Sequence, residues 1–202
     1  MRSQSGSGVS DRGAAARAPV ERSRAEAFRA VGELEAAIGL ALAALPDESR
    51  FRPWLTRIRA DLVDLGSDLA LPFEGERRPP LRIEARQVQW LEATCEQARR
   101  EVVPLRAFVL PGWSEAAACL RAAHGVCRRA ERRVAGLARL EPAGSHSAAY
   151  LRRLGDLLFV FARAVDADTG ARPRLRRPSA ATLARAAERI APEPAPPRQA
   201  PA

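Results

Sequence analysis

Apolar residues recur at steps of three and four along most of the chain, without the strict alternation of a half-buried strand. That spacing places them on one face of a helix. Proline and glycine interrupt the pattern, as in LPFEGERRPP over 71–80. The pattern predicts an all-α, up-and-down bundle of five helices, over 21–45, 48–71, 88–105, 114–140 and 147–167.

The two ends of the chain differ in composition from the middle. The first 20 residues are rich in Ser, Gly, Ala and Arg, and Arg, Pro and Ala dominate after Gly170. Such segments bury too little apolar surface to fold, apart from a short helix expected at 180–190. We therefore predict a leader over 1–20, one domain over 21–168 and a disordered tail over 169–202.

The amino-acid composition supports the helical prediction, and the distribution of charge limits the classes of binding partner that we expect. Hydrophobic residues make up 47% of the chain and aromatics only 5%, so alanine and leucine, both good helix formers, dominate. The net charge of +9 lies mostly at the ends, with seven Arg and two Glu in 171–202. Because the middle is nearly balanced, we expect no nucleic-acid partner for the domain. The basic segment 172–178 is either a solubilising tail or a non-specific polyanion binder.

Nothing in the sequence predicts a membrane span or a metal centre. No apolar run approaches the roughly 20 residues that a spanning helix needs. The first 20 residues lack the apolar segment of a secretory signal, so we expect a cytoplasmic protein, although their Arg and Ser content leaves an organelle transit peptide open. The three cysteines lack zinc-site spacing, and we expect Cys95, Cys119 and Cys127 to be buried core residues.

The segment CRRAERRVAGL, 127–137, carries four arginines and one glutamate. On a helix, Arg121, His124, Arg128 and Glu131 share one face beside the apolar face. Arginine offers planar, bidentate donors that suit phosphate oxygens, so this stripe is a candidate anion site. We expect Glu131 to orient a guanidinium at the next residue or across a subunit interface. The alternative is a solvated stripe of weak ion pairs.

A second polar cluster lies in YLRRLGDLLFVFAR, 150–163. Arg152 and Asp156 are one helical turn apart, and Asp156 precedes an apolar run. A carboxylate in such surroundings needs a partner, and we expect an arginine to supply it.

The blocks GELEAAIGLALA, QWLEATCEQ, PLRAFVLPGW, VCRRAERRV and YLRRLGDLLFVFAR, in this order, resemble the PduO-type ATP:cob(I)alamin adenosyltransferases over about 22–166. The resemblance implies a five-helix bundle that forms a homotrimer, with ATP and the corrinoid cobalamin meeting at each subunit interface. It also implies transfer of the 5′-deoxyadenosyl group of ATP, bound with Mg²⁺, to cobalt(I), with release of triphosphate.

The resemblance assigns roles to particular residues. It implies that Phe108 crowds the lower face of the corrin and that Asp156 also belongs to the corrinoid site. The ATP-binding residues that it implies are Gly6, Gly8, Ser10, Arg128, Arg129, Glu131, Arg132 and Arg152.

This chain also departs from the family pattern near the expected ATP site. The N-terminal loop lacks its acid, and an acid and an arginine that pair in the family are Gly32 and His124 here. Trp113 replaces a glycine, and Arg152 replaces an amide. These changes favour, as an alternative, a catalytically impaired paralogue that binds a corrinoid, a nucleotide or an active adenosyltransferase subunit. In a further version of this alternative, His124 is a ligand to cobalt.

Overall fold

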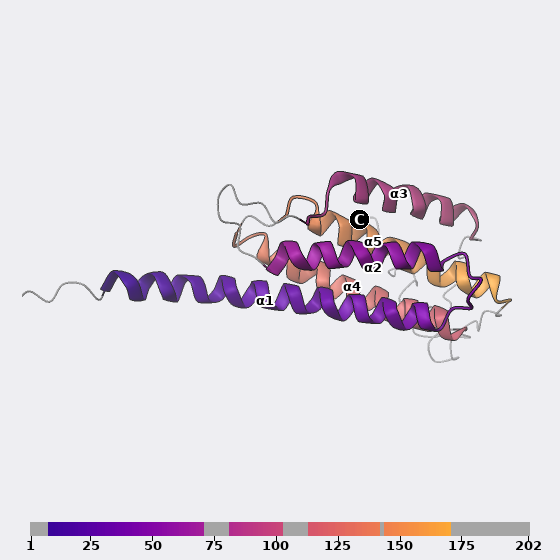
Figure 1. Cartoon of the computed structure of the whole chain (residues 1–202), viewed down its shortest axis with the longest axis horizontal. Coiled ribbons are helices and arrows are strands. Elements are labelled where there is room, and N and C mark those ends of the chain that lie inside the picture. The colour runs from indigo at the N-terminus through magenta and orange to yellow at the C-terminus, as the bar shows by residue number, and fades with distance from the viewer. Residues whose placement is uncertain (1–7, 71–80, 103–112, 142–143, 171–202) are drawn as a thin grey trace, which may run out of the picture.

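The computed structural model describes residues 8–70, 81–102, 113–141 and 144–170, with side chains from Arg17 onward. Within these ranges the chain forms no strand. It forms five helices, which confirms the all-α prediction: α1 Gly8–Ala43, α2 Arg52–Ala70, α3 Ala85–Arg100, α4 Glu115–Leu137 and α5 Ser147–Asp168 (Figure 1). No described helix is long and apolar enough to cross a membrane.

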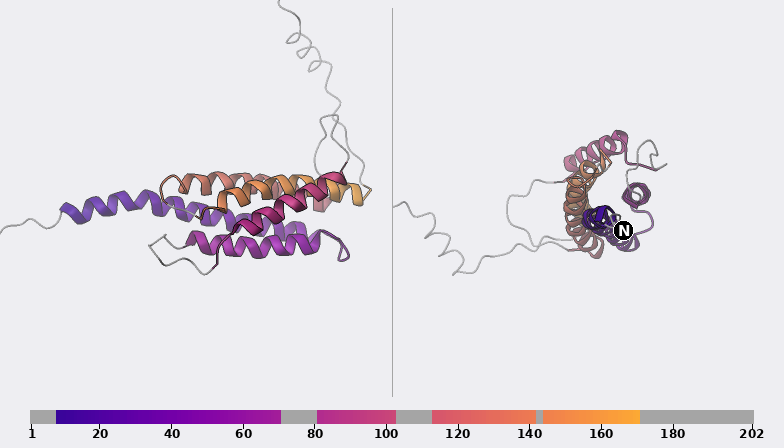
Figure 2. Two further views of the ribbon diagram at one scale, coloured as in Figure 1. Left: turned by 90° about the horizontal axis from the view of Figure 1, so that it is seen from above. Right: turned by 90° about the vertical axis from the view of Figure 1, so that its left-hand side faces the viewer.

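The helices lie side by side in an order that differs from their order in the chain. Helix α1 packs against α2 and α4, and α5 packs against α4 and α3. Seen end-on, the bundle is an arc with α2 and α3 at its two ends (Figure 2). The adjacent helices α4 and α5 therefore hold the centre of the bundle, where their buried leucines, alanines and valines form much of the core.

Helix α1 differs most from the sequence prediction. It begins at Gly8 rather than at residue 21, and Pro19 lies inside it. Its first turns project beyond the other helices (Figure 1). The stretch before Pro19, GAAARA, consists mostly of alanine, the strongest helix former, so a proline that normally ends or bends a helix does not end this one. The leader predicted over 1–20 is thus helical from Gly8 onward.

The start of α4 is capped by a side chain. Ser114 accepts a hydrogen bond at its Oγ from the amide of Ala117, and Glu115 adds an acid to the first turn. The buried carboxylate of Asp166 on α5 accepts from both the amide and the hydroxyl of Ser114, each at 2.9 Å. These bonds tie the first turn of α4 to α5.

The burial of the cysteines agrees in part with the prediction. Cys95 and Cys127 are buried as predicted, whereas Cys119 is only half-buried. The thiol of Cys127 donates to the carbonyl of Leu151 at 3.2 Å, and burial raises its pKa to about 12. Cys127 is therefore a packing residue between α4 and α5 rather than a reactive thiol.

Candidate functional site

Arg128 on α4 lies between two carboxylates. Its Nη1 donates to Glu131 Oε2 at 2.9 Å, and its Nη2 donates to Asp156 Oδ1 on α5 at 2.8 Å. The pKa of Arg128 is raised, mainly by the hydrogen bond to Glu131 and further by the one to Asp156. The arginine partner predicted for Asp156 is therefore present. Within the chain Glu131 pairs with Arg128 rather than with Arg132, because residues three apart share a helix face and adjacent residues do not.

Gly155 makes this arrangement possible. A Cβ atom at this position would lie 3.2 Å from both Cζ and Nε of Arg128. The guanidinium thus lies close against the backbone of α5, where any other residue would crowd it. No local pattern in the sequence indicates this role, because the contact joins residues of two different helices, Arg128 on α4 and Gly155 on α5.

A polar cavity of about 810 Å³ opens beside this ion pair. Three arginines and three acids line it, and Arg153 is paired with Glu92 of α3 at 2.7 Å. Among the described residues Arg152 forms no ion pair, so its guanidinium is available to a ligand. The charged lining residues are Glu92, Arg128, Glu131, Arg152, Arg153 and Asp156.

A second cavity, of about 530 Å³, lies on the other side of Arg128 and Asp156. We call it the basic cavity, because Asp156 is its only acid among the described residues. Its lining residues are Arg99, Val102, His124, Arg128, Asp156, Phe159, Val160 and Arg163. The Arg128–Asp156 pair lines both cavities and so forms a shared wall between them.

His124 is held in one orientation at the edge of the basic cavity. Its Nδ1 lies 2.8 Å from the carbonyl oxygen of Gly155, and its ring meets Phe159 edge-on at 5.9 Å. A carbonyl only accepts, so Nδ1 carries the proton and Nε2 of the neutral ring is an acceptor. Ligation of cobalt by His124 stays a prediction.

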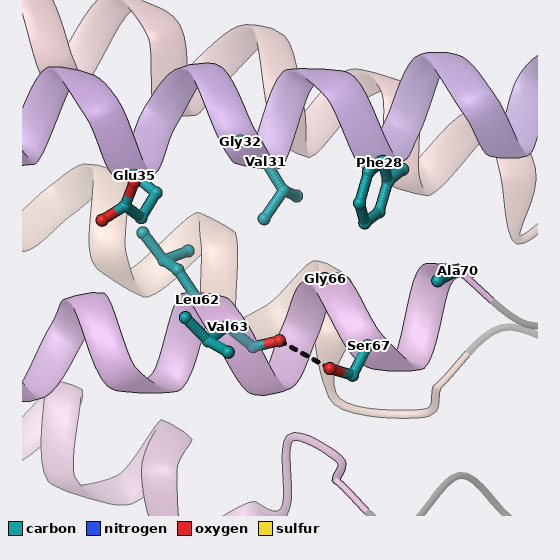
Figure 3. A pocket seen from close by; sticks show the side chains of 9 residues that line it. All are labelled: Phe28, Val31, Gly32, Glu35, Leu62, Val63, Gly66, Ser67 and Ala70. Atoms are coloured by element: carbon teal, nitrogen blue, oxygen red, sulfur yellow. Dashed lines mark hydrogen bonds between the residues drawn. The ribbon is translucent and has the colours of Figure 1, made fainter.

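A third hollow is an apolar groove of about 370 Å³ between α1 and α2. Figure 3 shows Phe28 and Val31 of α1 facing α2 across it. Phe28 continues the apolar three-and-four spacing of α1, yet the residue is 47% exposed. Its ring instead lies over Gly66, where a Cβ would come within 3.7 Å. Gly32, one of the departures from the family pattern, also lines the groove.

The predicted site residues separate into three groups. Arg128, Glu131, Arg152 and Asp156 converge on the polar cavity. Arg129 is exposed and pairs with Glu33 of α1, and Arg132 is exposed outside the cavity lining.

The remaining predicted residues do not join this cluster. Gly8 and Ser10 lie in the projecting first turns of α1 rather than in a loop, and Gly6 and Phe108 lie outside the described residues. No group of three or more potential metal ligands occurs in the described part of the chain. The sequence analysis did not identify Glu92 or Arg153 as site residues. Arg153 could have been identified, because it lies three residues before Asp156 and therefore shares its helix face.

Comparisons with known proteins show which family the chain is similar to. A family model described as cobalamin adenosyltransferase matches residues 5–165. A corrinoid adenosyltransferase of Mycobacterium tuberculosis is 38% identical over 148 residues, covering 72% of this chain and 77% of the relative. A corrinoid adenosyltransferase of Bacillus subtilis is 37% identical over 150 residues, covering 73% of this chain and 76% of the relative.

Solved structures show the same fold. A phenylalanine-to-alanine variant of the PduO-type ATP:corrinoid adenosyltransferase from Lactobacillus reuteri, complexed with cobalamin and ATP, superposes with a TM-score of 0.70 at 28% identity. The match covers 77% of this chain and 87% of that one. An arginine-to-lysine variant of the same enzyme, complexed with ATP, superposes equally well at 27% identity over the same shares.

Proposed function

This chain belongs to the cobalamin adenosyltransferase family, and we propose that its two adjoining cavities hold ATP and a corrinoid for adenosyl transfer. The reaction moves the 5′-deoxyadenosyl group of ATP to cobalt(I). The cobalt supplies the electron pair for the new bond to C5′, and triphosphate leaves with the electrons of the broken C5′–O bond. The observation that carries the proposal is the wall of Arg128 and Asp156, which lines both cavities.

The polar cavity suits the triphosphate of ATP. Arg128 and Arg152 present guanidinium groups that bind phosphate oxygens in pairs of hydrogen bonds. Glu131 orients Arg128 from the same helix face. We expect Mg²⁺ to arrive with the nucleotide, coordinated mainly by phosphate oxygens. The predicted contacts of Gly6, Gly8, Ser10, Arg129 and Arg132 with ATP remain part of this proposal.

The basic cavity suits the corrinoid. Val102, Phe159 and Val160 supply apolar surface for a macrocycle, and Asp156 reaches the cavity from the shared wall. Phe108, assigned to the corrin face by the resemblance, follows Val102 by six residues in the sequence. Placing the two ligands on either side of one wall brings C5′ and the cobalt into neighbouring volumes, which is the proximity that the transfer requires.

We also propose that the chain works as a cytoplasmic homotrimer. Phe28 and Val63, which are 47% and 58% exposed, flank the apolar groove between α1 and α2. Exposed apolar surface of this kind is typical of a contact with another chain. The first turns of α1, which include Gly8 and Ser10, project beyond the other helices, and we expect these residues to contribute to a neighbouring subunit.

A second candidate is a paralogue that binds a ligand without turnover, alone or assembled with an active adenosyltransferase. Gly32 and His124 favour it, because they stand where the family pattern has an acid and an arginine that pair, and neither can form that ion pair here.

Adenosylcobalamin formation from cob(I)alamin and ATP under reducing conditions, followed by absorbance, tests the transferase function. Turnover that depends on both protein and ATP supports it, and no turnover above buffer contradicts it. Calorimetry with ATP and with hydroxocobalamin separates the second candidate. If the protein binds the corrinoid but does not bind ATP and shows no turnover, the non-catalytic candidate is favoured.

A further inference from the structure

We propose that Arg50 is a positioning residue for the corrinoid, because it binds Glu101 and Asp168 at once and so holds one side of the basic cavity in place. This inference rests on the proposed function, which assigns the basic cavity to the corrinoid. Arg50 lies in the connection between α1 and α2, and neither it nor its two partners lines that cavity. Arg50 therefore acts through the residues that it holds and does not touch the ligand.

The α3 side of the basic cavity is only weakly held by the core. Helix α3 lies at one end of the arc of helices and packs mainly against α5 (Figure 2). Its buried residues end at Ala98. The two residues of this segment that line the cavity, Arg99 and Val102, come after Ala98, and Arg99 is exposed while Val102 is half-buried. Because packing stabilises in proportion to the apolar area buried, other contacts must hold this stretch.

Hydrogen bonds from Arg50 supply such contacts. Its Nε donates to Oδ2 of Asp168 at 2.8 Å, and its Nη2 donates to Oδ1 of the same carboxylate at 3.0 Å. Its Nη1 donates to Oε2 of Glu101. Asp168 is the last residue of α5, and Glu101 directly precedes Val102. One guanidinium thus joins the ends of α3 and α5, and we call Arg50, Glu101 and Asp168 the Arg50 clamp.

The guanidinium of Arg50 is also held by an aromatic ring. Its Cζ lies 4.9 Å from the ring centroid of Phe51, which is buried and meets Phe161 of α5 edge-on at 5.2 Å. Most surface ion pairs are weak because two mobile side chains lose entropy when they pair. A guanidinium that lies over a buried ring and binds one carboxylate with two hydrogen bonds has less freedom to lose. We therefore expect the clamp to contribute more than an isolated surface pair.

The clamp lies far along α3 from the polar cavity. Glu92 of α3 pairs with Arg153 of α5, and both residues line the polar cavity. Glu92 precedes Glu101 by nine residues, which corresponds to about 13 Å along a helix. Loss of the clamp should thus loosen the basic cavity while the Glu92–Arg153 pair still ties α3 to α5 beside the polar cavity. Corrinoid binding should change, and ATP binding should not.

The test measures the two substrates separately. Steady-state kinetics give the KM for cob(I)alamin and the KM for ATP, and absorbance titration gives the Kd for hydroxocobalamin. Arg50→Gln should raise the KM for cob(I)alamin and the Kd for hydroxocobalamin about fivefold, because fewer molecules have the cavity wall in place. The KM for ATP should be unchanged. Hydrogen exchange of the amides of 99–102 should be faster in this variant.

Further variants assign the effect to the clamp. Glu101→Gln should reproduce part of the effect, and adding it to Arg50→Gln should have no further effect, because the same bond is already lost. Arg50→Lys, which keeps the charge but not the planar set of donors, should retain part of the wild-type affinity. Arg100→Gln is the matched control, since Arg100 is exposed in the last turn of α3 and pairs with Glu96 of the same helix. Thermal unfolding verifies that each variant is folded.

Two kinds of failure can be distinguished. If Arg50→Gln matches Arg100→Gln in exchange or in the KM for cob(I)alamin, or raises both KM values together, the positioning role is overturned and the proposed function stands. If wild-type protein neither binds hydroxocobalamin nor turns over cob(I)alamin, the proposed function is overturned, and this inference with it.

Discussion

Arg128 on α4 donates to Asp156 on α5 across 2.8 Å, and the two residues form the wall between the polar and the basic cavity. A guanidinium in this position can exchange a carboxylate for a phosphate oxygen without leaving its place. The pair thus links the ATP side and the corrinoid side of the proposed site through one contact.

Arg128→Lys should raise the KM for ATP about tenfold, because lysine keeps the charge and loses the planar pair of donors. Steady-state kinetics with varied ATP measure the effect. Arg133→Lys is the control, since Arg133 is exposed and pairs with Glu26 outside the polar cavity. A larger effect at Arg133 than at Arg128 would contradict the assignment of the polar cavity to ATP.

Gly155→Ala should lower kcat/KM for ATP without destabilising the fold. The added methyl group would lie 3.2 Å from Arg128, which must then shift by a few tenths of an ångström. Alanine in a helix is favoured over glycine by roughly 0.5–1 kcal/mol, so the free energy of unfolding should not fall. In Gly136→Ala, where a Cβ meets nothing within 4 Å, activity should be unchanged. Equal kinetics in both variants would show that Arg128 tolerates the methyl group.

The buried Asp61–Tyr150 contact should make stability depend on pH. Tyr150 donates to Asp61 at 3.1 Å, yet burial outweighs this bond and raises the pKa of Asp61 above its ordinary value of 3.8. The folded state therefore holds this proton more tightly than the unfolded state. The stability that the group contributes is fully present below pH 3.8 and is lost as the pH rises through the raised pKa.

Urea unfolding of wild type and Asp61→Asn at a series of pH values measures this dependence. The free energy of unfolding of wild type relative to the variant should be highest at acidic pH and should decline as the pH rises. Asp47→Asn, at an almost fully exposed side chain, serves as the control. A difference that grows with pH would mean that the carboxylate, rather than the acid, is the favoured buried form.

A thiol reagent should modify Cys119 before Cys127 in the native protein. With a pKa of about 12, Cys127 is thiolate at only about one part in 10⁴ at pH 8, and it is also fully buried. Cys119 is half-buried on the same helix. Mass spectrometry after brief labelling identifies the modified residue, and denaturant should make all three cysteines reactive. Fast labelling of Cys127 would indicate that α4 and α5 separate readily.

Phe28→Asp should weaken the proposed trimer, since it places a charge in the apolar groove between α1 and α2. Leu40→Asp is the control, because Leu40 is 66% exposed on the same helix and does not line the groove. Light scattering gives the mass of each variant. If Phe28→Asp keeps the mass of wild type, the groove is not the subunit contact.

The sequence by itself determined which segments are helices and which chemistry the chain carries. The three-and-four spacing of apolar residues is local information, and it predicted all five helices observed. The arginine stripe around Arg128 and the need of Asp156 for an arginine partner could also be predicted, because a carboxylate beside an apolar run must be neutralised. Helix ends were less accurate, since the first helix was predicted to begin at residue 21, whereas α1 begins at Gly8 and continues through Pro19.

Only the tertiary structure decided which residues meet. The pairing of Arg128 with Asp156, the role of Gly155 and the sharing of one wall by two cavities all depend on how α4 lies against α5. The exposure of Phe28 likewise depends on the distance between α1 and α2, since apolar spacing shows which face is apolar and not what covers it. These are contacts between residues far apart in the chain, and helical periodicity contains no information about them.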